Sequence, residues 1–120
     1  MSNDKPFVVK NGFNARYYPL SASSLAGTSI DVSSADYFTK TLSANTTFTF
    51  TNPPPSGQVG SFALEITGAS TYTITWPASV KWHQATTPDS PAAGEKDLYL
   101  FLTIDGGTTY FARQGGDASS

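Results

Sequence analysis

The run TYTITWPASVKW, residues 71–82, alternates strictly between small hydroxyl side chains and large apolar ones until it reaches Pro77. Its first half places Tyr72, Ile74 and Trp76 on one side of an extended chain and the threonines on the other. Side chains two residues apart share a face of a strand, so this period predicts a half-buried β-strand. The proline predicts its end, because proline cannot donate to a sheet ladder.

Runs of the same kind recur at short intervals from Asp36 onward, separated by turn-forming segments such as 52–57, rich in proline, and 105–107, rich in glycine. Short, closely spaced strands without helical periodicity are typical of a sandwich or barrel. The predicted strands are residues 37–42, 46–51, 60–66, 71–76, 80–82, 97–104 and 108–113. The sequence therefore predicts an all-β fold, an antiparallel β-sandwich or jelly-roll-like domain of about 7–8 strands.

Residues 97–104, DLYLFLTI, carry large apolar side chains on both faces. Leu98, Leu100, Leu102 and Ile104 share one face, and Tyr99 and Phe101 share the other. We expect a central strand that fills the core of the domain with one face. The other face requires a cover, which can be a second sheet, a loop or a neighbouring chain. We expect Tyr99 and Phe101 to form this subunit contact.

The first thirty residues lack a long alternating run and are predicted to form an N-terminal arm. The β-sandwich domain is then residues 31–115, and residues 116–120 form a flexible tail. Such an arm either folds back on its own core or grips another subunit, since its apolar side chains need a surface to lie on. The candidate contact residues of the arm are Phe7, Val8, Val9, Phe13, Tyr17, Tyr18 and Leu20.

Composition narrows the range of partners. Charged residues make up 13% of the 120 residues, about half of the roughly 25% usual in soluble domains. Hydroxyl-rich, charge-poor surfaces are typical of chains that assemble or that work outside the cell. The net charge of −2 and the pI near 5.0 provide no basic footprint, so nucleic acid is not an expected partner.

The chain contains no cysteine, and no apolar run approaches the roughly 18 residues of a membrane span. We therefore expect no disulfide framework and no membrane partner. The polar start MSNDK lacks the hydrophobic segment of a signal peptide. We expect synthesis in the cytoplasm without export by that route.

Catalytic and metal-binding patterns are sparse. The only histidine, His83, lies in the polar segment HQATTPDSP with no nucleophile and orienting carboxylate beside it. The aspartates do not follow the spacing of a calcium loop. We expect no catalytic residue, no metal, no cofactor and no enzymatic activity, against the alternative of a small hydrolase. Trp82 is a candidate for stacking on a sugar ring, or else packs in the core or against a subunit.

Three motifs in order, NTTFTFTNPP, TWPASVKW and DGGTTYF, lie between Ile30 and Gly115. Together they resemble a β-domain common in virion proteins of tailed bacteriophages, and the opening FVVKNGF looks like the start of many phage fibre and head-associated chains. After the second tryptophan such relatives often carry a glycine-rich proline loop, where this chain reads HQATTPDSP. The resemblance implies a structural role in the virion, as a homotrimer without enzymatic activity.

Two locations on the virion fit this resemblance. A single β-domain with an arm suits a capsid decoration or cement protein, whose arm binds the major capsid protein and whose trimers clamp the head shell. The alternative is a tail fibre or baseplate appendage that contacts host glycans, with Trp82 and residues 84–91 at its tip.

Overall fold

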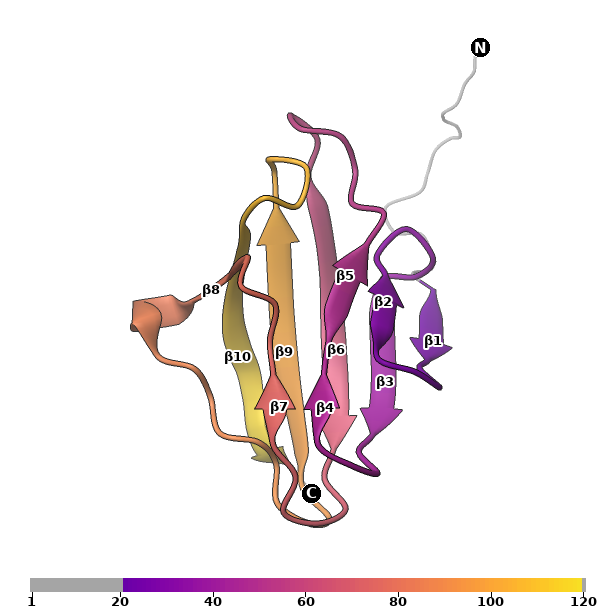
Figure 1. The fold of residues 1–120 in the computed structure, drawn as a ribbon, viewed down its shortest axis with the longest axis vertical. Helices are drawn as coiled ribbons and strands as arrows, with labels where there is room; N and C mark the ends of the chain where they lie inside the picture. The colour runs from indigo at the N-terminus through magenta and orange to yellow at the C-terminus, as the bar shows by residue number, and fades with distance from the viewer. Residues whose placement is uncertain (1–20, 120) are drawn as a thin grey trace, which may run out of the picture.

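The computed structural model describes residues 21–119, with side chains for residues 21–116, as two layers of β-strands. The larger layer is a six-stranded sheet in the order β1-β3-β6-β9-β10-β8, which lies behind the other strands in Figure 1. Its strands are β1 (Ala22–Ser24), β3 (Tyr37–Thr41), β6 (Gly60–Thr67), β9 (Lys96–Thr103), β10 (Tyr110–Ser119) and β8 (Val80–Trp82). A short 3-10 turn, η1 (His83–Ala85), follows β8.

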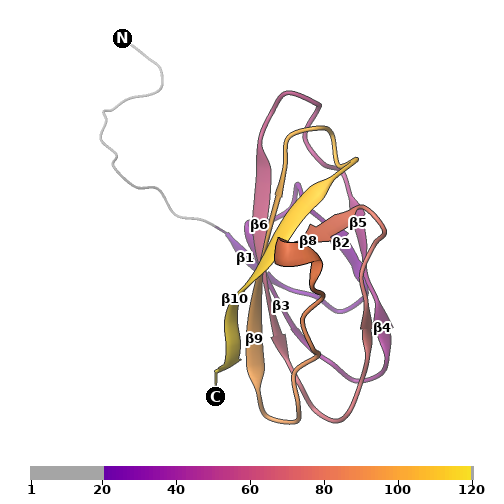
Figure 2. The same cartoon turned by 90° about the vertical axis from the view of Figure 1, so that its left-hand side faces the viewer.

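The second layer consists of two short parallel pairs that cover one face of this sheet, as the edge-on view shows (Figure 2). The strand β2 (Ser29–Asp31) pairs with β5 (Thr49–Thr51), and β4 (Thr46–Thr47) pairs with β7 (Ile74–Thr75). Between β4 and β5 the chain changes partner at Phe48, whose N–H donates to the carbonyl of Thr75 at 3.0 Å. One extended stretch thereby joins the two halves of the layer.

The pairing within the six-stranded sheet is mixed. The pairs β1–β3, β3–β6 and β8–β10 are parallel, whereas β6–β9 and β9–β10 are antiparallel. Parallel neighbours need a crossover connection. Here strands of the second layer supply it, because β2 lies between β1 and β3 in sequence, and β4 and β5 lie between β3 and β6. No helix is required for these crossovers.

The core fills the space between the two layers. In the large sheet, Phe62, Leu64 and Ile66 of β6 and Tyr99 and Phe101 of β9 are at most 5% exposed. Rings from the two layers meet in near-perpendicular pairs, for example Phe50 against Phe62 at 5.2 Å between ring centroids, and within the second layer Phe48 stacks on Trp76 at 5.4 Å. The other buried apolar residues are Ile30, Ala35, Phe38, Leu42, Phe48, Tyr110 and Ala112.

A proline loop closes one end of the sandwich against the β9–β10 hairpin. Gly107 has a φ of +84°, and a Cβ at this position would lie 2.8 Å from the ring of Pro53. The N–H of Gly57 donates to the carbonyl of Ile104 at 2.9 Å. Only glycine fits both the backbone conformation and the close approach, so the prediction of a turn at residues 105–107 is confirmed.

The all-β prediction is confirmed, and five of the seven predicted strands begin within two residues of an observed one and follow its course. The predicted antiparallel pairing is found for β6–β9 and β9–β10, whereas the other strand pairs are parallel because strands cross between the layers. The predicted strand 71–76 is regular only at Ile74–Thr75, and the predicted strand 46–51 divides at Phe48.

The predicted domain boundaries also shift. Residues 22–30, assigned to the arm, contain β1 and most of β2, and Ile30 is fully buried. The folded domain therefore includes residues from 21 onward. The predicted tail is shorter too, because β10 extends to Ser119. The contact residues proposed for the arm, from Phe7 to Leu20, lie outside the described residues.

Candidate functional site

The outer face of the six-stranded sheet, opposite the second layer, is apolar at its centre. Strand β9 alternates between buried and exposed residues, with Tyr99 and Phe101 at 1% and 2% exposure and Leu100 and Leu102 at 39% and 43%. Phe111 on β10 pairs in register with Leu102 and is 59% exposed. Three large apolar side chains on two adjacent strands therefore meet solvent.

This arrangement corrects the predicted subunit contact. Tyr99 and Phe101 are in the core of the chain itself, where Phe101 stacks on Phe62 at 4.8 Å between ring centroids. Their side chains are thus not open to another subunit. The face available to a second chain is the opposite one, which carries Leu100 and Leu102. The sequence identified a strand with two apolar faces but assigned the two faces the wrong way round.

The apolar strip continues toward the proline-loop end of the sheet. Ile104, directly after β9, is 55% exposed, and Val59, directly before β6, is 67% exposed. Single exposed apolar residues are ordinary, but a contiguous group of them marks a surface that other molecules contact. We call the exposed apolar residues of the outer face the apolar strip. They are Val59, Leu100, Leu102, Ile104 and Phe111.

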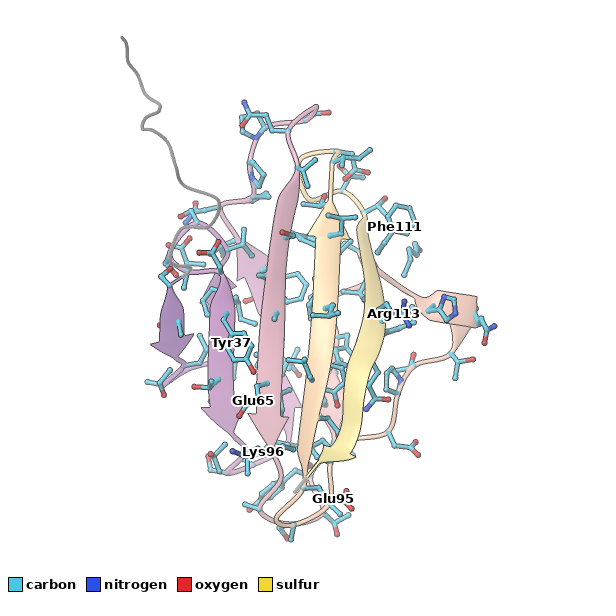
Figure 3. The ribbon with its side chains drawn as sticks, turned by 180° about the vertical axis from the view of Figure 1, so that it is seen from behind. Tyr37, Glu65, Glu95, Lys96, Phe111 and Arg113 are labelled. Atoms are coloured by element: carbon cyan, nitrogen blue, oxygen red, sulfur yellow. The ribbon has the colours of Figure 1, made fainter. Side chains whose placement is uncertain are left out.

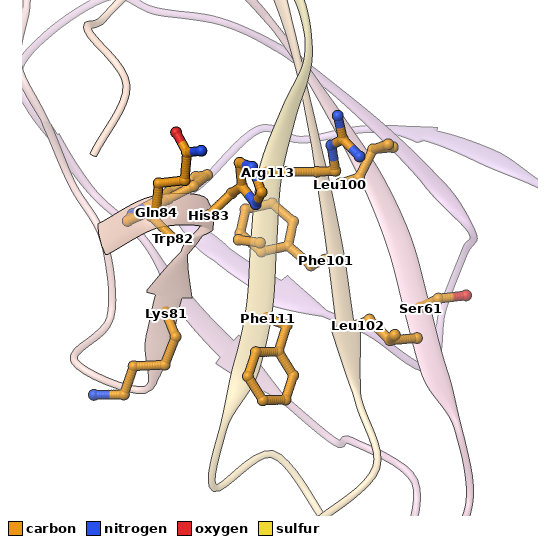
Figure 4. A pocket seen from close by; sticks show the side chains of 11 residues that line it. Ser61, Lys81, Trp82, His83, Gln84, Leu100, Phe101, Leu102, Phe111 and Arg113 are labelled. Atoms are coloured by element: carbon orange, nitrogen blue, oxygen red, sulfur yellow. The ribbon is translucent and has the colours of Figure 1, made fainter. Parts of the chain in front are cut away.

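Two depressions adjoin Leu100, and Ser61 lines both of them. The first, the β8–β10 groove, has a volume of about 640 Å³ and is lined by residues of β9 and β10, by the β8–η1 segment and, at its far side, by Ser61 of β6 (Figure 4). The second, the β6–β9 hollow, has a volume of about 280 Å³. Its lining residues are Asp36, Ser61, Phe62, Ala63, Leu100 and Phe101. Small side chains on β6 thus leave a hollow beside large ones on β9 and β10.

Charged residues border the apolar strip, with two cations on one side and two carboxylates, one of them paired with Lys96, on the other. Lys81 and Arg113 lie at the β8–β10 side, where they line the groove. Asp36 and Glu65 lie at the β3–β6 side, and Asp36 borders the hollow. Figure 3 shows Arg113 and Glu65 on different strands of this face. Among the described side chains Arg113 forms no ion pair.

Glu65 is held in a small network on the outer face. The hydroxyl of Tyr37 donates to Glu65 Oε1 at 2.6 Å, and Lys96 Nζ lies 3.6 Å from Glu65 Oε2 (Figure 3). The hydrogen bond to Glu65 raises the pKa of Tyr37, because it favours the protonated phenol. Asp36 is engaged at the edge of the sheet, where its carboxylate accepts from Ser21 N–H at 3.2 Å.

Trp82, the candidate for stacking on a ligand, packs against the core with part of its side chain and lines the β8–β10 groove with another part. Trp82 is half-buried and packs edge-on against Trp76 and Tyr99, at 5.1 and 5.9 Å between ring centroids. It also lines the β8–β10 groove together with His83 and Gln84 (Figure 4). The structure therefore brings Trp82 and the start of the predicted loop together at one depression.

The β9–β10 turn that supports this face is organised by Asp105. Its Oδ1 accepts from the N–H of Thr109 at 2.8 Å and from the hydroxyl of Thr103 at 3.1 Å. The hydrogen bond from the Thr109 backbone, followed by those of the neighbouring hydroxyls, lowers the pKa of Asp105. Asp31 is similar, with its pKa lowered chiefly by the hydroxyl of Ser33 at 2.6 Å. Both carboxylates thus serve local turns.

Within residues 21–119, no three histidine, cysteine or acidic residues gather as they would around a metal ion. No helix in the same part of the chain is long and apolar enough to cross a membrane.

The fold and this surface define a two-layer, all-β domain with one sheet face closed by its own chain and the other open and apolar. Comparisons with protein-family models, with curated proteins and with solved structures find no match.

Sequence reasoning missed Arg113, Phe111 and the small residues of β6 as parts of a site. Ser61, Leu102 and Phe111 lie in one row across the sheet. This row is visible only when the pairing of β6, β9 and β10 is known, and the sequence alone does not give that pairing.

Proposed function

We propose that this chain is a structural protein of a bacteriophage virion and has no enzymatic activity. The observation that carries the proposal is the open apolar face of the sheet, with Leu100, Leu102 and Phe111 exposed. A β-domain that leaves such a strip uncovered is suited to assembly with other chains. The three motifs that resemble phage virion domains point in the same direction.

Within the virion we propose a capsid decoration protein. Its trimer would bind the head shell through the N-terminal segment, and the β-domain would contribute the contact between subunits. Repeated weak contacts with a shell add up, because each bound site raises the effective concentration of the next. The hydroxyl-rich, charge-poor composition of the chain fits a surface that is covered in an assembly.

Labelled-antibody electron microscopy of intact particles tests this proposal. We expect label distributed over the head. Label confined to the tail would overturn the decoration role, and absence from purified particles would overturn a virion role altogether.

The contribution of the N-terminal segment is tested in the full chain by Phe13→Ser combined with Tyr17→Ser. We expect this variant to occupy purified capsids less than the wild-type chain does. Asn3→Ser in the same segment provides a control that removes no aromatic anchor. Unchanged occupancy would exclude these aromatic residues as capsid contacts.

A second candidate function rests on the β8–β10 groove, where Trp82, Gln84 and Arg113 line a depression of about 640 Å³. An aromatic ring with polar neighbours is suited to stacking on a sugar. In this alternative the chain belongs to a tail fibre or baseplate and contacts host glycans.

Glycan-array binding that is lost in Gln84→Ala and retained in Gln58→Ala would favour the fibre role. Gln84 is the better probe than Trp82 because Trp82 also packs on the core, so its truncation would change stability as well. Absence of binding to any glycan would overturn the role of this groove as a glycan contact.

A further inference from the structure

We propose that the outer face binds a second copy of this chain, rotated about an axis parallel to β9, so that the β10 side of one copy packs on the β6 side of the other. This names the partner of the assembly surface on which the proposed function rests. The cross-strand register, the sizes of the paired side chains and the distribution of charge support this pairing.

The register places small and large residues at the same level on opposite sides of β9. One row crosses the sheet from Ser61 through Leu102 to Phe111, and the next crosses from Ala63 through Leu100 to Arg113. The β6 ends of both rows are small and the β10 ends are large. The β6–β9 hollow, with a volume of about 280 Å³, lies at the small ends. The face therefore carries small side chains beside the hollow and, at matching levels across β9, the large side chains of Phe111 and Arg113, which border the β8–β10 groove.

Rotation about an axis parallel to the strands keeps each residue at its level but exchanges the two sides of the face. Phe111 of one copy then meets Ser61 of the other, and Arg113 meets Ala63. Projections enter hollows, which is the complementarity that close-packed interfaces require. An axis in the sheet plane but perpendicular to the strands would instead place β10 on β10, with its large residues opposed and the two hollows facing each other.

The charges favour the same rotation. Asp36 lies beside Ala63, whose N–H donates to the Asp36 carbonyl at 3.0 Å. When Arg113 of one copy lies over Ala63 of the other, its guanidinium reaches the side of the face that carries Asp36 and Glu65. The perpendicular axis would place Arg113 and Lys81 near their own counterparts, and like charges directly opposite one another are destabilising.

The extent of the face is sufficient for association. The sheet from β3 to β10 is four strands wide, and β6 and β9 are eight residues long. At ~4.8 Å between strands and ~3.3 Å per residue this face measures roughly 500 Å² in projection. This projected area is of the same order as the ~800 Å² that each partner contributes to a stable interface.

Charge exchange in the full chain tests the pairing. The dissociation constant of the wild-type assembly, from sedimentation equilibrium, is compared with those of Arg113→Glu, Asp36→Arg and the chain carrying both substitutions. We expect each single substitution to weaken association about 10-fold or more and the double variant to recover most of the loss. Lys40→Glu is the control, since Lys40 pairs in register with the buried Ile66 and lies on the other face.

Recovery in the double variant separates a contact between copies from a structural effect of Asp36, which also accepts hydrogen bonds from Ser21. Additive losses in the double variant would overturn the proposed pairing. So would a wild-type chain that stays single at every concentration.

Ser61→Phe provides a second, independent variant, because Ser61 is exposed and its enlargement fills the hollow without changing charge. We expect it to weaken association to a similar extent. Unchanged association would overturn the insertion of Phe111 into this hollow.

The outcome is distinguishable from that of the proposed function. A chain that pairs as described but is absent from virions would refute only the virion role. A chain that is present on virions but insensitive to charge exchange would refute only the pairing.

Discussion

The two faces of the six-stranded sheet have the same backbone but different partners. The inner face meets the second layer, and its β9 residues Tyr99 and Phe101 are almost fully buried. On the outer face of the same strand, Leu100 and Leu102 are about two-fifths exposed. Both faces are apolar, so hydrophobicity alone does not distinguish a core from an interaction surface. The difference lies in whether the chain supplies its own cover.

The largest expected effect separates the two faces on β9. Phe101→Ala removes a ring buried between Phe50, Phe62 and the tryptophans, and we expect it to lower the free energy of unfolding by ~3–5 kcal/mol. Leu102→Ala on the outer face should cost about 1 kcal/mol or less in the dissociated chain, since much of its side chain is already in water. Urea denaturation at low protein concentration measures both.

Equal losses of unfolding free energy for these two substitutions would contradict the assignment of one face to the core and the other to an interaction surface. A small loss for Phe101→Ala would mean that the second layer does not pack as described.

Removing the hydroxyl of one tyrosine on each face is expected to change the free energy of unfolding by a smaller amount, with opposite signs for the two faces. The hydroxyl of Tyr110 is buried and has no hydrogen-bond partner among the described residues, so Tyr110→Phe should raise the free energy of unfolding by about 1 kcal/mol. The hydroxyl of Tyr37 donates to Glu65, so Tyr37→Phe should lower it by about 1 kcal/mol. Thermal and urea unfolding of the two variants gives the signs directly. A loss in Tyr110→Phe would show that its hydroxyl is satisfied by a bound water.

The smallest expected effect is the dependence of stability on alkaline pH. The hydrogen bond to Glu65 raises the pKa of Tyr37, and burial, with the charge of Asp105 second, raises that of Tyr110. A group with a raised pKa in the folded state binds its proton more tightly there, so its contribution is complete below the ordinary tyrosine pKa of ~10 and is lost as the pH rises beyond it. We expect stability to fall above about pH 10 and the fall to be reduced in Tyr37→Phe. An identical alkaline profile in the variant would exclude Tyr37 as a cause.

Much of the fold could be predicted from alternation. The inward positions Phe48, Phe62, Leu64 and Ile66 follow from a period of two, and they are buried. The direction of pairing could not be predicted, since a short strand has the same pattern in parallel and antiparallel neighbours. The strands β1 and β2, residues 22–31, were missed because three residues are too few to show a period.

The candidate site was only half predictable. The pattern DLYLFLTI identified a strand with two apolar faces. Which face was open depended on where the second layer lay. Tyr99 and Phe101 lie on the inner face, where they contact Trp76 and Phe50 of the second layer. The opposition of Ser61 to Phe111 depends on register between strands far apart in sequence, which a single pattern does not encode.

The most direct test of the account is the mass of the full chain in solution, measured by sedimentation for the wild type and for Leu102→Glu. The chain has a mass of 12.7 kDa. If the outer face is the surface that a second copy covers, the wild type sediments at a multiple of this mass, and Leu102→Glu, which places a charge at the centre of the face, sediments as a folded single chain. A wild type that remains at the mass of one chain at every concentration, or a Leu102→Glu variant that assembles like the wild type, would contradict the account.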